Sequence, residues 1–351
     1  MDVDIKIATS KPCYFAGETV EGTVTVNVTD SDGTPANGLF LELKGKISSK
    51  VVFGNDVRRQ SKDITEHVLP LTKFGGHAEF GNHVFPFALV LPVNLPSSMK
   101  ETCVGGRSCC SIEYSLKGKL KRPGFLNFDT KDKHEIEVFA TPKVSGPLPV
   151  LAGPDSTAVK TCCCFTKGCM SIGFLADRSV MSHNEVLGIT VVARNDSTKP
   201  VKELVVELCQ DATWTANRMT GTKKRTIASI KVSGSQLGDV WKPAERGSGR
   251  GRSVDVSAVR NELEGFLRSG AGVRHELVVP KDCFDTMDSE LIVVRHSIEA
   301  KLKDPSGVKS PNVCTSVVVQ RAGGAVSGGA TQPMPVETAT PATPPAVGLD
   351  A

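Results

Sequence analysis

Apolar and polar side chains alternate along several stretches of the chain, which is the pattern of a β-strand with one buried face. In the clearest stretch, Val20, Val24 and Val26 share one face with Gly22, and polar side chains fill the other face. Between such stretches lie clusters of turn-forming residues, for example residues 29–38. The pattern therefore predicts an all-β chain of many short strands.

The alternation places individual strands along both halves of the chain. The predicted strands occupy residues 20–28, 39–47, 83–91, 112–121, 134–140, 170–176, 186–193, 203–209, 274–280, 290–302 and 313–320. A helical spacing occurs at Val259, Leu263 and Phe266, so a short helix is predicted over residues 256–268.

Composition shifts divide the chain. Four prolines and two glycines between residues 141 and 155 indicate a domain boundary. After Arg321 the chain is rich in Gly, Ala, Thr and Pro, which is typical of a disordered segment. The predicted organisation is an N-terminal domain at 1–142, a linker at 143–158, a C-terminal domain at 159–321 and a disordered tail at 322–351.

Four sequence blocks of the first half recur in the same order in the second half. IEYSLKGKLKRP at 112–123 returns as VRHSIEAKLKDP at 294–305. The other pairs are 16–26 with 183–193, 39–43 with 204–208, and 88–92 with 276–280. We interpret the repeat as a duplicated unit that forms two β-sandwiches in tandem, with two unrelated β-domains as the alternative.

Composition and charge narrow the class of protein. The 351 residues are 39% hydrophobic, which is enough for two ordinary cores. A net charge of +4 is too small to favour nucleic acid, but it suits acidic partners or an anionic membrane surface. The start MDVDIKIATS lacks the pattern of a secretory signal. We therefore expect a cytoplasmic chain, peripheral at the plasma membrane or endosomes, whose eleven cysteines are reduced thiols.

Several motifs resemble the arrestin superfamily. FPFALVLPVNLPSS at 85–98 is similar to the N-domain signature of that family, and SIEYSLKGKLKRPG at 111–124 resembles the strand that follows it. CYFAGETVEGTVTV at 13–26 resembles the family's opening segment, and the cysteine-rich residues 162–201 resemble the C-domain opening of the α-arrestin branch. The segment KGKLKRPGFL has no helical pattern where visual and β-arrestin types carry a short helix. The resemblance is thus to the α-arrestin, or arrestin domain-containing, branch, or to an older arrestin-like branch.

The resemblance implies two tandem arrestin-like (immunoglobulin-like) β-sandwich domains and a non-catalytic adaptor or scaffold. Such a protein binds cytoplasmic segments of membrane proteins and links them to endocytosis, sorting or ubiquitination, with trafficking or ubiquitin-ligase proteins as partners. The tail lacks the P-P-x-Y motif that docks WW domains, so ligase recruitment through that motif is not predicted. The alternative is a structural subunit of an endosomal sorting coat, similar to the retromer subunit with the arrestin fold.

Lysines supply the candidate binding residues. Lys6 and Lys11 lie in the region where the resemblance implies contact with phosphorylated tails. Lys117, Lys119 and Lys121 share one face of a predicted strand and form a basic stripe. A solvated sheet face is the alternative interpretation of this stripe.

No catalytic residue, cofactor site or metal site is predicted. The cysteines between 162 and 169 cluster, but adjacent side chains on a strand point to opposite faces and cannot all ligate one ion. Palmitoylation and simple burial are the other interpretations of this cluster. The seven histidines are scattered, without a carboxylate at a recognisable spacing. We therefore expect that the protein is not an enzyme.

Overall fold

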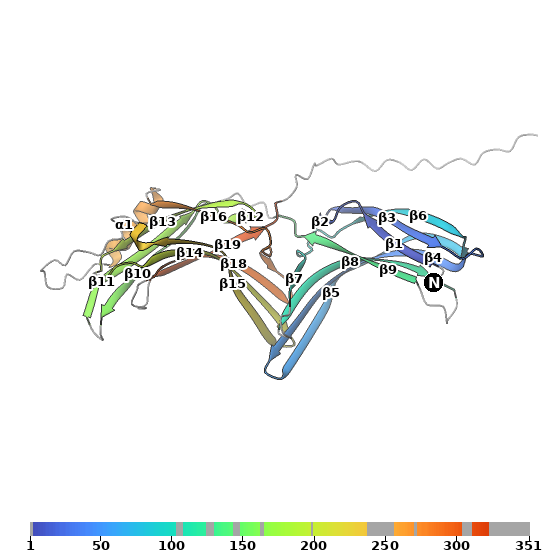
Figure 1. Cartoon of the computed structure of the whole chain (residues 1–351), viewed down its shortest axis with the longest axis horizontal. Helices are drawn as coiled ribbons and strands as arrows, with labels where there is room; N and C mark the ends of the chain where they lie inside the picture. Colours follow the sequence, from blue (N-terminus) through green and yellow to red (C-terminus); the bar gives the residue numbers. More distant parts are fainter. Residues whose placement is uncertain are drawn as a thin grey trace, which may run out of the picture.

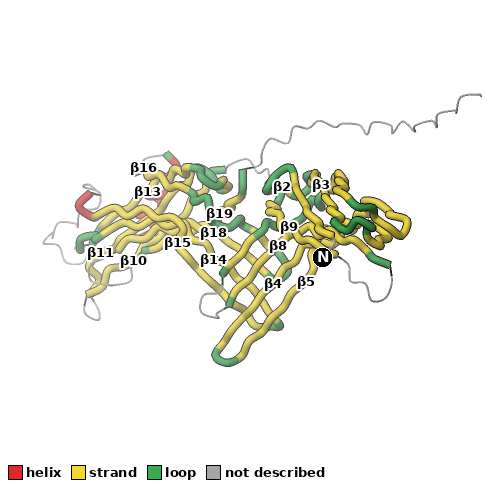
Figure 2. Tube along the Cα trace, turned by 45° about the vertical axis from the view of Figure 1, so that its right-hand side comes forward, coloured by secondary structure: helices red, strands yellow, loops and turns green. Residues whose placement is uncertain are grey.

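The molecule is elongated, with the two halves of the chain side by side and a V-shaped rib projecting from its middle (Figure 1). The computed structural model describes residues 3–102, 108–123, 130–142, 148–161, 165–197, 199–236, 256–269, 272–303 and 311–322. Each arm of the V comes from one half of the chain, and the two arms cross where they meet (Figure 2).

In the first half, strands are the regular elements that the described residues form. They are β1 (Val3–Thr9), β2 (Cys13–Phe15), β3 (Thr19–Val28), β4 (Thr34–Phe53), β5 (Asp56–Ala78), β6 (Gly81–Val90), β7 (Met99–Glu101), β8 (Cys109–Lys121) and β9 (Thr130–Phe139). One sheet has the order β1-β3-β6, and the other has the order β2-β9-β8-β4-β5 with β7 paired to β8. The inward faces of the two sheets enclose one core.

The second half repeats this arrangement and adds a helix. Its elements are β10 (Val150–Thr161), β11 (Phe165–Ala176), β12 (Val180–Ser182), β13 (Val186–Asn195), β14 (Glu203–Ala216), β15 (Met219–Ser233), the 3-10 turn η1 (Gly234–Gln236), α1 (Val256–Arg268), β16 (Val273–Val278), β17 (Met287–Asp288), β18 (Ile292–Lys303) and β19 (Asn312–Gln320). Its sheets have the orders β10-β11-β13-β16 and β12-β19-β18-β14-β15, with β17 paired to β18.

The large sheets of the two halves have equivalent strand orders. The pair β2–β9 is parallel, and so is its counterpart β12–β19. The repeated sequence blocks also fall on equivalent strands, because 112–123 overlaps β8 and 294–305 overlaps β18. The predicted all-β architecture of two tandem sandwiches is confirmed.

A repeated glutamate holds the same turn in both halves. The Glu18 carboxylate accepts a hydrogen bond from the backbone N–H three residues before it, at 2.9 Å, and pairs with Lys11. Glu185 accepts the equivalent bond at 2.6 Å and pairs with Arg178. Glu18 and Glu185, which are equivalent in the sequence repeat, therefore close the turns before β3 and β13 in the same way.

Alternating side chains fill two separate cores. Leu41 of β4 and its counterpart Val206 of β14 are fully buried. Leu120 of β8 and Leu302 of β18 are likewise 0% and 1% exposed. Each pair is split between the two apolar clusters, so the repeat builds the same core twice.

The rib strands are longer than the sequence pattern predicts. β4 and β5 contain 20 and 23 residues, whereas alternation predicted a strand at 39–47 and none over β5. Much of β5 is exposed on both faces because it projects beyond the sandwich. Alternation reports a strand with one buried face, so it could not reveal this strand.

The boundary between the halves also differs from the expected one. β10 begins at Val150, inside the segment predicted as a linker at 143–158, and pairs with β11 in the second sandwich. The proline- and glycine-rich composition concealed this strand. The predicted tail beyond residue 322 lies outside the described residues, as do Cys162, Cys163 and Cys164.

Helix α1 confirms the helix predicted over 256–268 and covers the outer face of the second sandwich. Val259, Leu263 and Leu267 pack against Val192 of β13. Phe266 was expected on this face but is 47% exposed. None of the helices among the described residues is long and apolar enough to cross a membrane.

We predict that Leu120→Ala and Leu302→Ala each lower the free energy of unfolding by about 2–5 kcal/mol, because each leaves a cavity in a closed core. The double variant should lose the sum to within about 0.5 kcal/mol, because the two leucines lie in different clusters. Chemical unfolding of the four proteins measures this. A larger coupling energy would show that the two cores are not independent. The exposed Val84→Ala serves as the control.

Candidate functional site between the two sandwiches

The two arms of the rib are joined by apolar packing and by hydrogen bonds to the backbone. Trp214 of β14 is 2% exposed, and its indole Nε1 donates to the carbonyl oxygen of Lys50 at 3.1 Å. Ser49 Oγ donates in return to the carbonyl oxygen of Thr215 at 2.5 Å. Apolar side chains of β14 and β18, including Ile292, belong to the same cluster as the first core. The two halves therefore share a buried interface.

Hydrogen bonds from the second half also contact β5, near the end of the β4–β5 hairpin. The backbone N–H of Asn217 donates to Gln60 Oε1 at 2.8 Å, and Asn217 Nδ2 donates to the carbonyl oxygen of Arg59 at 3.1 Å. An ion pair joins Lys62 to Glu290 across the same boundary. These contacts fix the end of the β4–β5 hairpin, where β5 is largely exposed.

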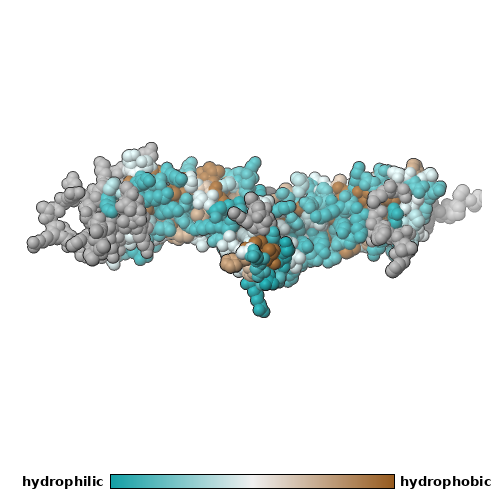
Figure 3. Space-filling view, turned by 60° about the horizontal axis from the view of Figure 1, so that its bottom comes forward, coloured by the Kyte–Doolittle hydropathy of each residue, from teal (hydrophilic) through white to brown (hydrophobic). Residues whose placement is uncertain are grey.

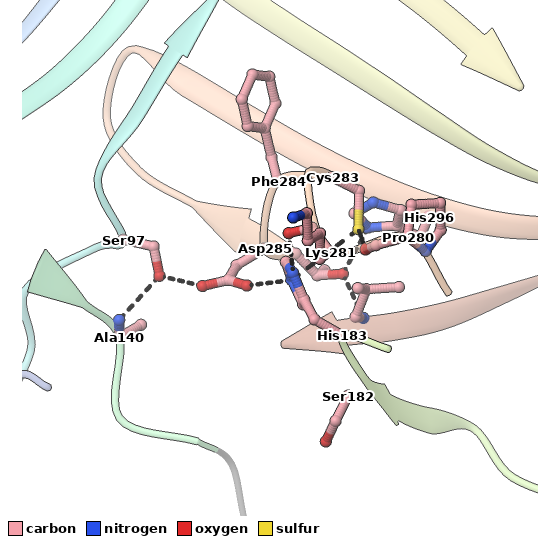
Figure 4. A network of polar contacts seen from close by, with 12 residues as sticks. Ser97, Ala140, Ser182, His183, Pro280, Lys281, Cys283, Phe284, Asp285 and His296 are labelled. Atoms are coloured by element: carbon pink, nitrogen blue, oxygen red, sulfur yellow. Dashed lines mark hydrogen bonds and ion pairs between the residues drawn. The ribbon is translucent and has the colours of Figure 1, made fainter. Parts of the chain in front are cut away.

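A buried carboxylate connects the two halves away from the rib (Figure 4). Asp285 is 6% exposed, and its Oδ2 accepts a hydrogen bond from Ser97 Oγ at 2.5 Å. Ser97 Oγ accepts in turn from the backbone N–H of Ala140 at 2.8 Å. Asp285 Oδ1 lies 2.9 Å from Nε2 of His183. The Asp285 carboxylate thereby connects a turn of the second half to Ser97, and through Ser97 to the segment of Ala140.

His183 is held in its doubly protonated form by its neighbours. Its Nδ1 lies 2.9 Å from the carbonyl oxygen of Lys281, and its Nε2 faces the carboxylate of Asp285. Both oxygens can only accept, so both ring nitrogens donate. Burial lowers the pKa of His183, but the hydrogen bonds to Asp285, to Cys283 and to the backbone outweigh it and raise the pKa to about 9.

The neighbouring His296 is neutral. It is 1% exposed, and its Nδ1 shares a hydrogen bond with Thr286 Oγ1 at 2.8 Å. Burial lowers the pKa of His296 to about 4; the positive charges of His183 and Arg225 act in the same direction, whereas Asp285 opposes them. The network thus contains one imidazolium and one carboxylate, whose charges balance.

Sequence reasoning did not find this network. Ser97, His183 and Asp285 lie in three separate connections of the chain, with no spacing that relates them. Ser97 belongs to the N-L-P-S-S motif, which was the one available signal. The packing of the two halves is what brings the three side chains together.

Of the five predicted lysines, Lys6 and the stripe on β8 lie on opposite faces of the first sandwich, and Lys11 lies in the connection between β1 and β2. Lys6 is on the outer face of the β1-β3-β6 sheet, beside Asp4 at 3.7 Å. Lys11 precedes β2, pairs with Glu18 at 3.3 Å and lies over the Tyr14 ring. The stripe on β8 is on the outer face of the other sheet. The structure therefore does not combine Lys6 and Lys11 with the stripe.

The stripe itself continues onto the next strand. Lys117 lies directly opposite Lys133 of β9, and Lys119 lies opposite Lys131. Lys119 pairs with Glu42, and Lys121 lies over the ring of Phe40 at 4.7 Å. Within the described residues, Lys117 and Lys131 make no ion pair. We call the set formed by Lys117, Lys119, Lys121, Lys131 and Lys133 the basic face.

The equivalent lysines of the second half are neutralised. Lys301 pairs with Glu207 at 2.5 Å, and Lys303 pairs with Glu203 at 2.9 Å. Like charges directly opposite each other destabilise a sheet, so the basic face carries a cost that its counterpart avoids. The repeat thus preserves one pair, because Lys119–Glu42 is equivalent to Lys301–Glu207. Among the described residues Lys121 makes no ion pair, whereas its counterpart Lys303 does.

One group of possible metal ligands and one disulfide-bonded cysteine bear on the metal and cysteine predictions. Donor atoms of Glu207, Cys209 and Glu299 lie within 4.8 Å of one another, but Lys301 and Lys224 already neutralise the two carboxylates, so we assign no metal there. Cys109 is disulfide-bonded to a partner outside the described residues, so the expectation of reduced thiols is wrong for it. An odd count of cysteines excludes complete pairing but not one bridge.

Residues 3–145 match the family model described as arrestin (or S-antigen), N-terminal domain. The first sandwich of the chain is thus similar to the N-terminal domain of the arrestin superfamily. It is 27% identical over 251 residues to arrestin domain-containing protein 4 of Mus musculus, a match that covers 66% of this chain and 58% of the relative. It is 24% identical over 247 residues to arrestin domain-containing protein 15 of Caenorhabditis elegans, covering 67% and 63%. The chain thus spans about three fifths of the length of these relatives.

The match to the arrestin N-terminal domain covers only part of the buried network. Ser97 and Ala140 lie within the matched N-terminal domain, whereas His183 and Asp285 lie beyond it. The buried carboxylate is therefore a contact between the region that matches the arrestin N-terminal domain and the second sandwich.

We predict that the wild-type protein is more stable than the His183→Gln variant by up to about 3 kcal/mol near pH 6. The reason is that the pKa of His183 is about 9 in the folded protein, above the ordinary value of 6.5. The folded state binds the extra proton between these values, so the advantage falls as the pH rises from 6.5 through 9. Unfolding midpoints at a series of pH values measure the difference. A constant difference from pH 6 to 9.5 would contradict it, and the exposed His67→Gln is the matched control.

Proposed function

We propose that this chain is a member of the arrestin superfamily and a non-catalytic cytoplasmic adaptor. It binds cytoplasmic segments of membrane proteins, at the plasma membrane or endosomes, and links them to endocytosis, sorting or ubiquitination. The observation that carries the proposal is the match of residues 3–145 to the arrestin N-terminal domain, in a chain whose sandwiches are joined by a buried network. Trafficking or ubiquitin-ligase proteins are the proposed partners.

The basic face is the proposed cargo surface. Its lysines oppose one another across β8 and β9, so an anionic ligand would remove a repulsion that the free protein bears. Figure 3 shows that hydrophilic side chains cover most of the N-terminal half in the view it presents. On the same sheet, a cavity of about 600 Å³ is lined by Lys46, Arg59 and Lys100 among serines. Acidic or phosphorylated segments fit this surface through charge-assisted hydrogen bonds.

We predict that the double variant Lys117→Glu with Lys131→Glu recovers cargo about tenfold less well, because it reverses the charge of the two unpaired lysines. The measurement is affinity purification of the full chain from its own cells, with mass spectrometry of the co-purifying proteins. Lys202→Glu with Lys231→Glu, on the second sandwich, is the matched control.

A chain ending at Arg321 distinguishes the two functional hypotheses in the same measurement. Membrane proteins and ubiquitin ligases that are depleted by the truncation favour the adaptor. A stoichiometric set of coat proteins, unchanged by the truncation and by the lysine variants, would replace the adaptor with the structural coat subunit.

A further inference from the structure

The end of the rib exposes apolar side chains. Strands β4 and β5 pair as far as Phe53 and Asp56, so a short turn ends the first arm. Phe53 is 79% exposed and Val57 is 39% exposed. Among the described residues, neither belongs to any of the three apolar clusters, so neither contributes to a core. We call residues 52–57 the rib end.

The rib end projects away from both sandwiches. The turn between β4 and β5 is the lowest point of the ribbon in Figures 1 and 2, and the two sandwiches lie above it. Figure 3, which brings this side forward, shows brown apolar side chains on the projection, with teal polar side chains around them. A flat surface that approaches from this side therefore meets the rib end before it meets either sandwich.

Positive charges lie directly behind the apolar end. Arg58 and Arg59 are two and three register positions behind the pair of Phe53 with Asp56, and Lys50 lies opposite Arg59. Both arginines are exposed, and they point to opposite faces of the hairpin because they are consecutive. A strand rises about 3.4 Å per residue, so these cations lie about 7–10 Å behind the end.

The second arm adds another cation at the same level. Asn217 Nδ2 donates to the carbonyl oxygen of Arg59 at 3.1 Å, so the β14–β15 turn lies beside that residue. Arg218 follows in the same turn, is exposed and makes no ion pair among the described residues. The acidic residue of this region is Asp56, which pairs with Arg58 at 3.1 Å. Residues 50–59 and 217–219 together hold four basic residues and one acidic residue.

An uncharged cavity between the two arms extends the apolar surface. Its volume is about 430 Å³, and its apolar lining comes from Val51, Val52 and Phe53 of the first arm and Met219 of the second. Serine, threonine and glycine complete the lining, and no charged residue of the described chain takes part in it. The rib is therefore apolar where it projects furthest and positively charged just behind that point.

This order of side chains along the rib fits a lipid bilayer. An apolar element that binds a membrane interface is buried about 5–10 Å into the boundary of headgroups and acyl chains. That depth matches the separation of Phe53 from the arginines, which then lie at the level of the anionic headgroups. One phenylalanine buries about 150–250 Å². The rib end is therefore too small for a standard protein interface, which needs about 800 Å² per partner.

We propose that the rib end inserts Phe53 and Val57 into the surface of an anionic phospholipid membrane. The guanidinium groups of Arg58, Arg59 and Arg218 then donate to lipid phosphates, and both sandwiches stay off the bilayer. This inference rests on the proposed location of the adaptor at a membrane, to which it adds the point of contact and the class of lipid. The contact is distinct from the basic face, which lies on β8 and β9.

The test is co-sedimentation of the purified full chain with vesicles at roughly 0.15 M salt. One set of vesicles is pure phosphatidylcholine, and the other contains about 30% phosphatidylserine. We expect at least tenfold stronger binding to the second set. Phe53→Ser should weaken that binding about tenfold, because the phenylalanine no longer leaves water. The matched control is Phe80→Ser, which removes a phenylalanine that is 63% exposed on the first sandwich and should leave binding unchanged.

The basic residues are tested in the same assay. Arg59→Gln with Arg218→Gln should weaken binding to the anionic vesicles about tenfold or more, because each basic side chain near such a surface contributes separately. Lys202→Gln with Lys231→Gln, on the second sandwich, is the control. Unfolding midpoints of all variants exclude loss of the fold as the cause.

Insertion has its own readout. In Phe53→Trp the added fluorescence, relative to the wild-type protein, should shift to shorter wavelength on the anionic vesicles and be quenched by brominated lipids. A tryptophan that stays unquenched would overturn insertion, and binding that survives Phe53→Ser unchanged would overturn the role of the rib end.

One further variant separates this proposal from the cargo surface. Lys117→Glu with Lys131→Glu should leave vesicle binding largely intact, and its loss in this variant alone would place the membrane contact on the basic face instead. Vesicle binding needs no cargo, and cargo recovery is measured from detergent extracts. Failure of the membrane contact therefore leaves the adaptor proposal standing, and the reverse also holds.

Discussion

The relative placement of the two sandwiches depends on the burial of one charge. A carboxylate removed from water is costly unless it is paired and hydrogen-bonded, and breaking such a pair typically costs about 3–5 kcal/mol. Asp285 meets this requirement with donors from both halves, Ser97 on one side and His183 on the other. If the halves separated, the carboxylate would lose Ser97 and the imidazolium would remain beside it. The network therefore favours one arrangement of the two sandwiches over others with similar apolar contact.

The duplication explains the sandwiches but not the contact between them. Glu18 and Glu185 close equivalent turns, and Leu120 and Leu302 fill equivalent core positions. At the boundary the symmetry is lost, because each repeat meets a different surface of the other. Tyr114 donates its hydroxyl to the carbonyl oxygen of Pro96, whereas the residue that replaces it in the second repeat is His296. The residues in which the repeats differ most in chemistry thus include those near the boundary.

The parts of the fold that could be read from the sequence are those with one buried face. β3, β8 and β18 alternate because their inner faces are closed in a core, and the helix at 256–268 shows its period for the same reason. β5 exposes both faces and leaves no period to detect. The network was equally hidden, because its members are single polar residues in separate turns. Their interaction depends on residues of the other half of the chain, which no local pattern reveals. The basic stripe was visible as a pattern on β8, but its extension to Lys131 and Lys133 depends on strand pairing.

A small net charge conceals a strong separation of charge in this molecule. The basic face gathers lysines that repel one another across β8 and β9, while a cavity between the two sandwiches is lined by carboxylates from both. The second repeat pairs Lys303 with Glu203, whereas its counterpart Lys121 makes no ion pair among the described residues, so the sheet itself does not require an unpaired lysine there. The basic face lies within the residues that match the arrestin N-terminal domain. Compensation would favour stability at Lys117 and Lys131, so their lack of ion pairs among the described residues agrees with the proposed binding of an acidic ligand at the basic face.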